Sequence, residues 1–181
     1  MLTRITAAVL MLAMLCLVST SGAVNNATAS ENGGASGLAP ASLPATNGEP
    51  APMNESSYRN FLSTVQSMYR EDFNYSGGVL EDYVNKTISE KDAMVATTSI
   101  FILTSHSVAL LETNKPPAAY ASAYNNTFQA LINLRAFLWN MSKFYETSKN
   151  AYLVQARKNL NDSVSYYKIG QGELTSSQPN S

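Results

Sequence analysis

The sequence predicts an all-α protein, an up-down-up-down four-helix bundle preceded by a signal peptide and a disordered spacer. Two observations predict the helices. From residue 54 onwards, apolar residues recur at intervals of three and four, which places them on one face of a helix. Glycine, proline and capping residues interrupt this spacing every twenty to thirty-five residues or so, which leaves four helical segments.

Residues 1–23 have the three parts of a secretory signal peptide. Arg4 supplies a positive charge, an apolar run covers residues 5–18, and Ser21 and Ala23 form a small-x-small end. The run is shorter than the roughly twenty residues that a transmembrane helix needs. We therefore expect cleavage after Ala23 and secretion, with membrane contact only through this segment where it is retained.

Cys16, the only cysteine, leaves open a second interpretation of this segment as a lipoprotein signal. Small residues precede the cysteine of such a signal, whereas Met14 and Leu15 are bulky, which argues against lipid attachment. Cleavage after Ala23 leaves a mature chain without cysteine and therefore without a disulfide. The hydrophobic core must then stabilise the fold alone.

The segments on either side of the helical region are polar. Residues 24–53 and 171–181 are rich in Asn, Ser, Thr, Gly and Pro, and they hold few large apolar side chains. Such segments cannot bury enough surface to offset the entropy of ordering them. We expect a flexible spacer at 24–53, a helical bundle domain at 54–170 and a disordered tail at 171–181.

The first helical segment is the most regular one. Its apolar side chains share one face between residues 58 and 73. Asn54 is the expected N-cap. The run Asn74–Gly78 ends in two glycines, and we expect the helix to stop there.

The second segment, residues 79–113, is apolar on nearly every side, so we expect it to be the central, most buried element. Ser89 and Asp92 can form a capping box, which would divide the segment into two helices. Residues 95–104 are rich in β-branched side chains that also suit a strand, but they do not alternate with polar ones. We expect a helix here.

Pro116 and Pro117 end the second segment and start the third, because proline suits the first turn of a helix. The third segment carries a wide apolar face as far as Tyr145. A weak break at residues 146–149 precedes the last segment, with Thr147 or Ser148 as its cap.

The last segment has a seven-residue repeat. Leu153, Leu160 and Tyr167 are each seven residues apart, the spacing that packs helices into bundles. We expect Gly170 to end this helix.

Charge balance and scarce metal ligands exclude several classes of function. The 12 basic and 13 acidic side chains leave no positive surplus to bind nucleic acid. One histidine and one cysteine cannot build the multi-residue sites that hold catalytic metals. The sequence also lacks a glycine-rich phosphate loop. We expect no cofactor, no metal and no catalytic activity.

Asn-x-Ser/Thr sequons, the acceptors of N-linked glycans, are frequent in the chain. Several sequon asparagines follow a core position by one residue, which turns them about 100° away from the core. We expect a glycosylated exterior in a host that glycosylates exported proteins. The asparagines are Asn26, Asn54, Asn74, Asn85, Asn125, Asn140 and Asn161.

Polar residues on the second segment offer an alternative ligand site. His106, the only histidine, lies near Thr98 and Ser105, and together they could contact a ligand in a pocket between helices. A histidine in such a place more often donates to a neighbouring carbonyl. Trp139 lies off the apolar line of the third segment, so we expect it to be an exposed aromatic.

Three stretches, Lys115–Tyr120, Asn126–Leu131 and Ala151–Arg157, resemble a pattern found in exported archaeal and bacterial helix-bundle proteins of unknown function. In those proteins a proline turn precedes a long helix, and a final helix closes the bundle. The resemblance covers roughly half of the chain. It implies a helix bundle and no particular activity.

Together these features favour a secreted or cell-surface-associated helical bundle that acts as a structural or interaction module without catalytic activity. Its partner would be an extracellular protein, a glycan or an envelope component. The alternative is an extracytoplasmic ligand-binding bundle similar to sensor domains, with Thr98, Ser105 and His106 beside its ligand.

Overall fold

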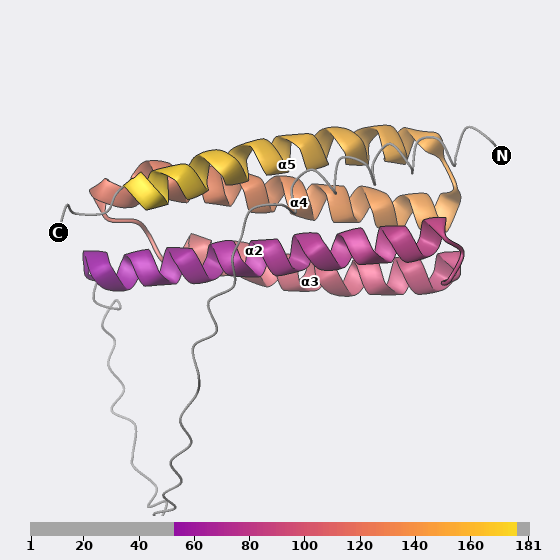
Figure 1. The fold of residues 1–181 in the computed structure, drawn as a ribbon, viewed down its shortest axis with the longest axis horizontal. Coiled ribbons are helices and arrows are strands. Elements are labelled where there is room, and N and C mark those ends of the chain that lie inside the picture. The colour runs from indigo at the N-terminus through magenta and orange to yellow at the C-terminus, as the bar shows by residue number, and fades with distance from the viewer. Residues whose placement is uncertain (1–52, 177–181) are drawn as a thin grey trace, which may run out of the picture.

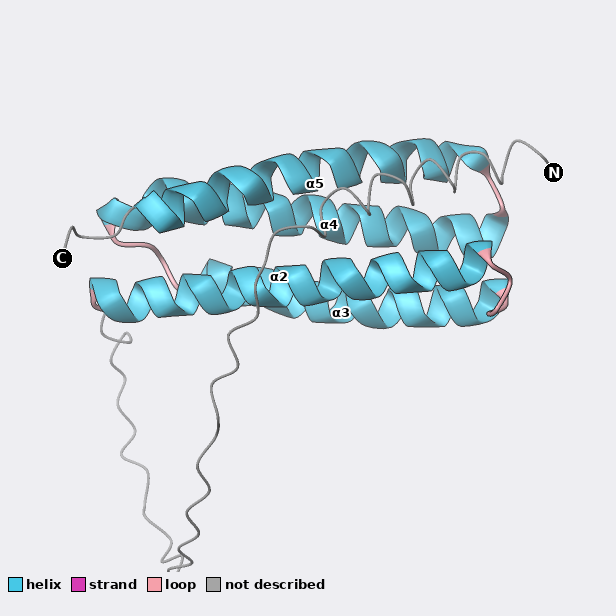
Figure 2. Cartoon of the chain, in the orientation of Figure 1, coloured by secondary structure: helices cyan, strands magenta, loops and turns pink. Residues whose placement is uncertain are grey.

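The structure, a computed structural model, describes residues 53–176. Their helices lie side by side, and these residues contain no strand (Figures 1 and 2). The prediction of an all-α helical bundle is confirmed. The elements are α2 (Glu55–Val84), α3 (Glu90–Thr113), the 3₁₀ helix η1 (Ala118–Tyr120), α4 (Ala121–Thr147) and α5 (Asn150–Ser176).

Several predicted features lie outside the described residues. They are the signal peptide at 1–23, nearly all of the spacer at 24–53, the sequon at Asn26 and the end of the tail at 177–181.

Helices that follow one another in the chain pack against one another, and α4 packs most extensively against α5. By contrast, α2 approaches α5 at only a few residues. The core contains side chains from all four helices, with α4 contributing many of the fully buried ones, such as Leu131, Leu134 and Leu138.

The start of α2 agrees with the sequence prediction, but its end does not. Asn54 Oδ1 accepts a hydrogen bond from the Ser57 amide at 2.9 Å, which confirms the N-cap. The predicted end at Asn74–Gly78 is wrong, because the helix continues to Val84. Leu80 is buried beyond the glycines, and its packing offsets the roughly 1 kcal/mol that each glycine costs in a helix.

Ser89 and Asp92 form the predicted capping box at the start of α3. Ser89 Oγ accepts from the Asp92 amide at 3.1 Å. The Asp92 carboxylate in turn accepts hydrogen bonds from the hydroxyl and the amide of Ser89, and these two bonds lower the pKa of the carboxyl. The expectation that α3 is the most buried element is wrong. Val95, Ile102 and Leu103 are exposed on its outer face, because no other helix of residues 53–176 covers that side.

The break between α4 and α5 lies where predicted. Ser148 follows α4 in the left-handed conformation with φ 55°, and α5 begins at Asn150. The predicted end at Gly170 is wrong, as is a disordered tail beginning at residue 171, because α5 continues to Ser176. Leu174 is buried and extends the seven-residue repeat of Leu160 and Tyr167 by one more step.

A second repeat on α5 consists of small residues. Ala156, Ser163 and Gly170 are seven residues apart, and all three are buried. A Cβ atom added at Gly170 would lie 3.0 Å from Thr127 Oγ1 and 3.2 Å from the Ala123 carbonyl oxygen. The backbones of α4 and α5 are therefore very close at this end, and we call this contact the small-residue seam.

Buried hydroxyl groups along the seam have hydrogen-bond partners. The Ser163 hydroxyl donates to the Ala130 carbonyl at 2.8 Å, so the Tyr69 hydroxyl at 2.8 Å must be the donor to Ser163 Oγ. Gln66 Nε2 donates to Thr127 Oγ1 at 3.0 Å. These bonds connect α2 to α4 and α5 across the core, and they specify how the helices pack.

Two glycine substitutions test this description. Gly78→Ala should raise the free energy of unfolding by about 0.5 to 1 kcal/mol, because nothing lies within 4 Å of the added Cβ. Gly170→Ala should lower it by about 1 kcal/mol, since the added Cβ crowds the backbone of α4. Urea unfolding measures both, and equal gains in the two variants would contradict the close approach at the seam.

Asp72 on α2 predicts a pH dependence of stability. Its carboxylate is buried and accepts a hydrogen bond from the Thr104 hydroxyl at 2.8 Å. Burial raises the pKa of this carboxyl, and the bond from Thr104 offsets part of the rise. The folded protein thus holds the proton more tightly than the unfolded chain. The stability that this group contributes is complete below its ordinary pKa and is lost as the pH rises through the raised value.

Asp72→Asn should therefore be more stable than the wild type at neutral pH, and this advantage should shrink as the pH falls. Melting temperatures of both proteins between pH 7 and pH 4 measure the difference. Glu81→Gln, at an exposed position on the same helix, is the control and should show no such trend. A difference between Asp72→Asn and wild type that does not change with pH would refute the assignment.

Candidate functional sites

The three residues predicted to contact a ligand all lie on α3. Thr98 and His106 are exposed on α3. The Ser105 hydroxyl donates to the Phe101 carbonyl of its own helix at 2.8 Å. The Thr98 hydroxyl likewise donates to a carbonyl of its own helix, that of Met94, at 2.8 Å. It also lies 3.2 Å from Ser142 Oγ of α4. None of the three lines the groove described below.

The sequon asparagines of the described residues lie on the surface, as their positions after core residues predict. Asn140 is half-buried and donates to the Ala136 carbonyl at 2.8 Å. The exposed ones are Asn54, Asn74, Asn85, Asn125 and Asn161.

The hydroxyl residues of three sequons are buried, however. Ser76, Thr127 and Ser163, which complete the sequons of Asn74, Asn125 and Asn161, are at most 5% exposed. Thr127 and Ser163 belong to the small-residue seam and its hydrogen bonds. Part of the sequon frequency therefore comes from packing, because a small hydroxyl residue faces the core two positions after a surface asparagine.

An uncharged surface covers the outer side of α3. Val95, Ile102 and Leu103 are more than half exposed. Residues 93–111 contain no Asp, Glu, Lys or Arg. Within them, Val95, Ser99, Ile102, His106 and Ala109 follow one another at intervals of four and three, and all are exposed. This spacing is the one by which a helix packs against another helix. We call this surface the α3 face.

Trp139 of α4 lies beside the α3 face. It is 52% exposed, as its position off the apolar line predicts. Its ring lies 6.0 Å from that of Phe101 on α3, and Lys143 Nζ lies 5.0 Å from the Trp139 ring centroid. Lys143 also pairs with Glu146 at 2.6 Å. An exposed tryptophan beside apolar side chains is typical of a protein-binding surface.

One helix among residues 53–176, α3, is long and apolar enough to cross a membrane by length and composition, and a third of its most apolar window is buried in the bundle. Its inner face packs on the other helices and holds Thr104, which bonds to Asp72 of α2. The apolar residues of α3 therefore lie on two sides of the helix, one packed in the core and the other exposed as the α3 face.

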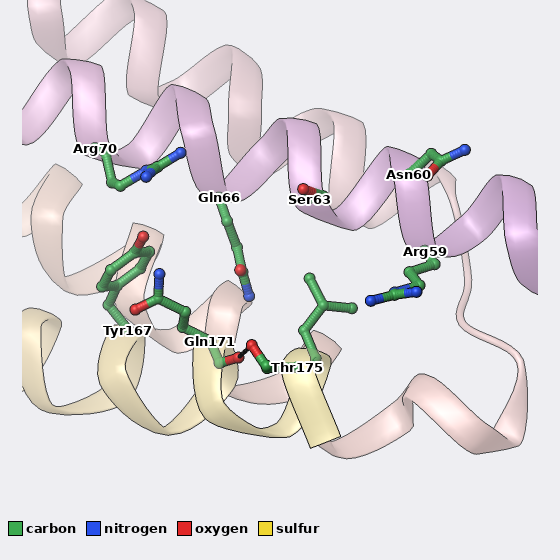
Figure 3. A pocket seen from close by; sticks show the side chains of 9 residues that line it. Arg59, Asn60, Ser63, Gln66, Arg70, Tyr167, Gln171 and Thr175 are labelled. Atoms are coloured by element: carbon green, nitrogen blue, oxygen red, sulfur yellow. Dashed lines mark hydrogen bonds between the residues drawn. The ribbon is translucent and has the colours of Figure 1, made fainter. Parts of the chain in front are cut away.

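A groove of about 430 Å³ lies between α2 and the end of α5 (Figure 3). Its lining is polar, and it contains two arginines and no carboxylate side chain. The lining residues are Arg59, Asn60, Ser63, Gln66, Arg70, Tyr167, Gln171, Leu174 and Thr175. We call this site the α2–α5 groove.

Neither arginine of the groove forms an ion pair with an acidic side chain of residues 53–176. The ion pairs of the described residues are Lys143 with Glu146 and Lys158 with Asp162, and both lie elsewhere. Arg70 Nη2 donates to Ser67 Oγ of its own helix at 3.0 Å. The positive charge of Arg70 lowers the pKa of Tyr167, which burial raises by more.

Tyr167 is the other unusual residue of the groove. Its ring stacks on that of Tyr69, with centroids 4.4 Å apart, and only 7% of the residue is exposed. Its hydroxyl oxygen is buried without a hydrogen-bond partner, the one such side-chain atom among residues 53–176. Buried polar atoms normally have a partner, so this hydroxyl retains an unused donor beside the groove.

The described residues contain no group of three His, Cys, Asp or Glu side chains that could hold a metal ion. Comparison of the chain with protein families, curated proteins and solved structures finds no match. The two surface sites are therefore interpreted from their own geometry.

Residue spacing in the sequence could predict part of the groove. Arg59 and Arg70 are eleven residues apart, three turns of a helix, so they share one face of α2. Tyr167 and Gln171 are a turn apart on α5 for the same reason. Spacing within a helix could not show that these two faces meet.

Proposed function

We propose that the protein is a secreted or cell-surface-associated helical bundle that acts as an interaction module and binds a protein partner through the α3 face. The observation that carries this proposal is the exposure of Val95 and Ile102 on an uncharged helix face, with the exposed Trp139 beside it. Apolar side chains that stay exposed together mark a surface that another protein covers.

The chemistry of the α3 face favours an uncharged, helical partner. Ser99 and Ala109 are small and lie in line with Val95 and Ile102, so another helix can approach closely along the same line. With no charged side chain between residues 93 and 111, the face offers no ion pairs and repels neither sign of charge. A second copy of this chain has this chemistry and is the simplest partner.

The proposal includes an up-down-up-down topology and export. The connections of two to seven residues between α2, α3, α4 and α5 favour antiparallel neighbours, since they leave little chain for a crossover. The signal-peptide pattern of residues 1–23 supports export, and exposed sequons such as those of Asn54 and Asn85 suit a glycosylated exterior.

Site-specific photo-crosslinking tests the interaction surface. A benzophenone amino acid at Ile102, in the cells that make the protein, should yield a discrete crosslinked species on irradiation. The same group at Val154 of α5 is the matched control, because Val154 is 72% exposed and Ile102 is 63% exposed. We expect at least a fivefold lower yield at Val154. No product at Ile102, or equal yields at both positions, would reject the α3 face as the binding surface.

Peptide mapping of the protein by mass spectrometry tests whether it is exported and glycosylated. The expected N-terminus is Val24, because cleavage follows Ala23. In a host that attaches glycans after folding, Asn54 and Asn85 should carry them, while Asn74, Asn125 and Asn161 should not, since the hydroxyls of their sequons are buried. An intracellular protein that still begins at Met1 would contradict export.

A further inference from the structure

We propose that the α2–α5 groove is a binding site for a small organic dianion, a molecule with two acidic oxygen-bearing groups such as carboxylates or phosphates. This inference is separate from the α3 face, because the groove lies between α2 and α5 and shares no residue with that face.

The charge of the groove is uncompensated. Arg59 and Arg70 supply two positive charges, and neither pairs with a carboxylate among the described residues. Figure 3 shows their side chains pointing toward each other along the groove, with Gln66 between them. Guanidinium groups bind carboxylate and phosphate oxygens through two parallel hydrogen bonds, so each arginine can hold one acidic group.

The dimensions of the groove suit a small molecule. Arg59 and Arg70 are eleven residues apart, so their Cα atoms are separated by about 16 Å along the axis of α2. Because both side chains point inward, the acidic groups that they hold must be closer together than this. The volume of about 430 Å³ lies within the usual range of small-molecule sites.

The middle of the groove favours a ligand with hydroxyl or carbonyl groups. Asn60, Ser63, Gln171 and Thr175 are exposed along its walls and can donate or accept hydrogen bonds. Gln66 Nε2 is occupied by Thr127, which fixes the side chain and leaves its carbonyl oxygen as an acceptor. A molecule with an acidic group at each end and hydroxyl or carbonyl groups between them matches this pattern.

Tyr167 supplies the unused donor. Its hydroxyl has no partner, although the residue is one of those that line the groove. Figure 3 shows this hydroxyl on the side of the ring that faces α2 and Arg70. A ligand oxygen held by Arg70 can accept the hydrogen bond, which would satisfy the one unpaired buried side-chain atom of the described residues.

Isothermal titration calorimetry with the mature full chain tests the site. The probes are glutarate and adipate as dicarboxylates, acetate as the matched monoanion, inorganic phosphate and pyrophosphate. At least one dianion should bind with a one-to-one stoichiometry, and acetate should bind at least tenfold more weakly. Pyrophosphate binding without dicarboxylate binding would identify the acidic groups as phosphates, and the reverse result would identify them as carboxylates; both support the site.

Variants distinguish this site from general attraction to a charged surface. Arg59→Gln and Arg70→Gln should each weaken binding of the dianion at least tenfold. Arg157→Gln removes an exposed arginine of α5 outside the groove and should leave the affinity within twofold. An equal loss in all three variants, or no binding of any dianion at millimolar concentration, would overturn the proposal.

Tyr167→Phe separates a ligand contact from a structural role. It deletes only a hydroxyl that has no partner, so the melting temperature of the free protein should stay the same or rise. Affinity for the dianion should fall several-fold. A lower melting temperature with unchanged affinity would assign the hydroxyl to the fold and remove Tyr167 from the site.

Discussion

The close approach of α4 and α5 is the constraint on which the rest of the bundle depends. Ala156, Ser163 and Gly170 place small residues at every seventh position of α5, and at Gly170 a single added carbon would touch the backbone of α4. The seam holds α5 against α4, while α2 packs on α3. Consequently α2 and α5 come close at few residues, and the groove lies between them.

Much of the fold could be predicted from spacing and capping. The Asn54 cap, the Ser89 and Asp92 capping box and the break at Ser148 are local features, and the structure contains them. The two predicted stops at glycines failed for a tertiary reason. Gly78 is followed by buried Leu80, and Gly170 is itself a packing residue of the seam, so neither glycine marks a helix end.

Little of the candidate sites could be predicted in the same way. Apolar residues all around α3 suggested full burial, because composition does not reveal which sides of a helix have a neighbour. Thr98, Ser105 and His106 are polar residues within an apolar stretch, which predicts a ligand site, but sequence alone does not show that Thr98 and His106 face outward while Ser105 bonds to its own helix. The groove combines residues of two helices that are distant in the chain, and the missing partner of the Tyr167 hydroxyl is a property of its surroundings in the folded protein.

The seam fixes the position of α5 against α4, and α5 forms one wall of the α2–α5 groove. A NOESY spectrum of the labelled protein measures the seam directly. Strong cross-peaks between the Gly170 Hα protons and the Thr127 side chain, and between the rings of Tyr69 and Tyr167, are the predicted result. Cross-peaks from Gly170 to its own helix alone would show that α4 and α5 are further apart, and they would contradict this account of the bundle.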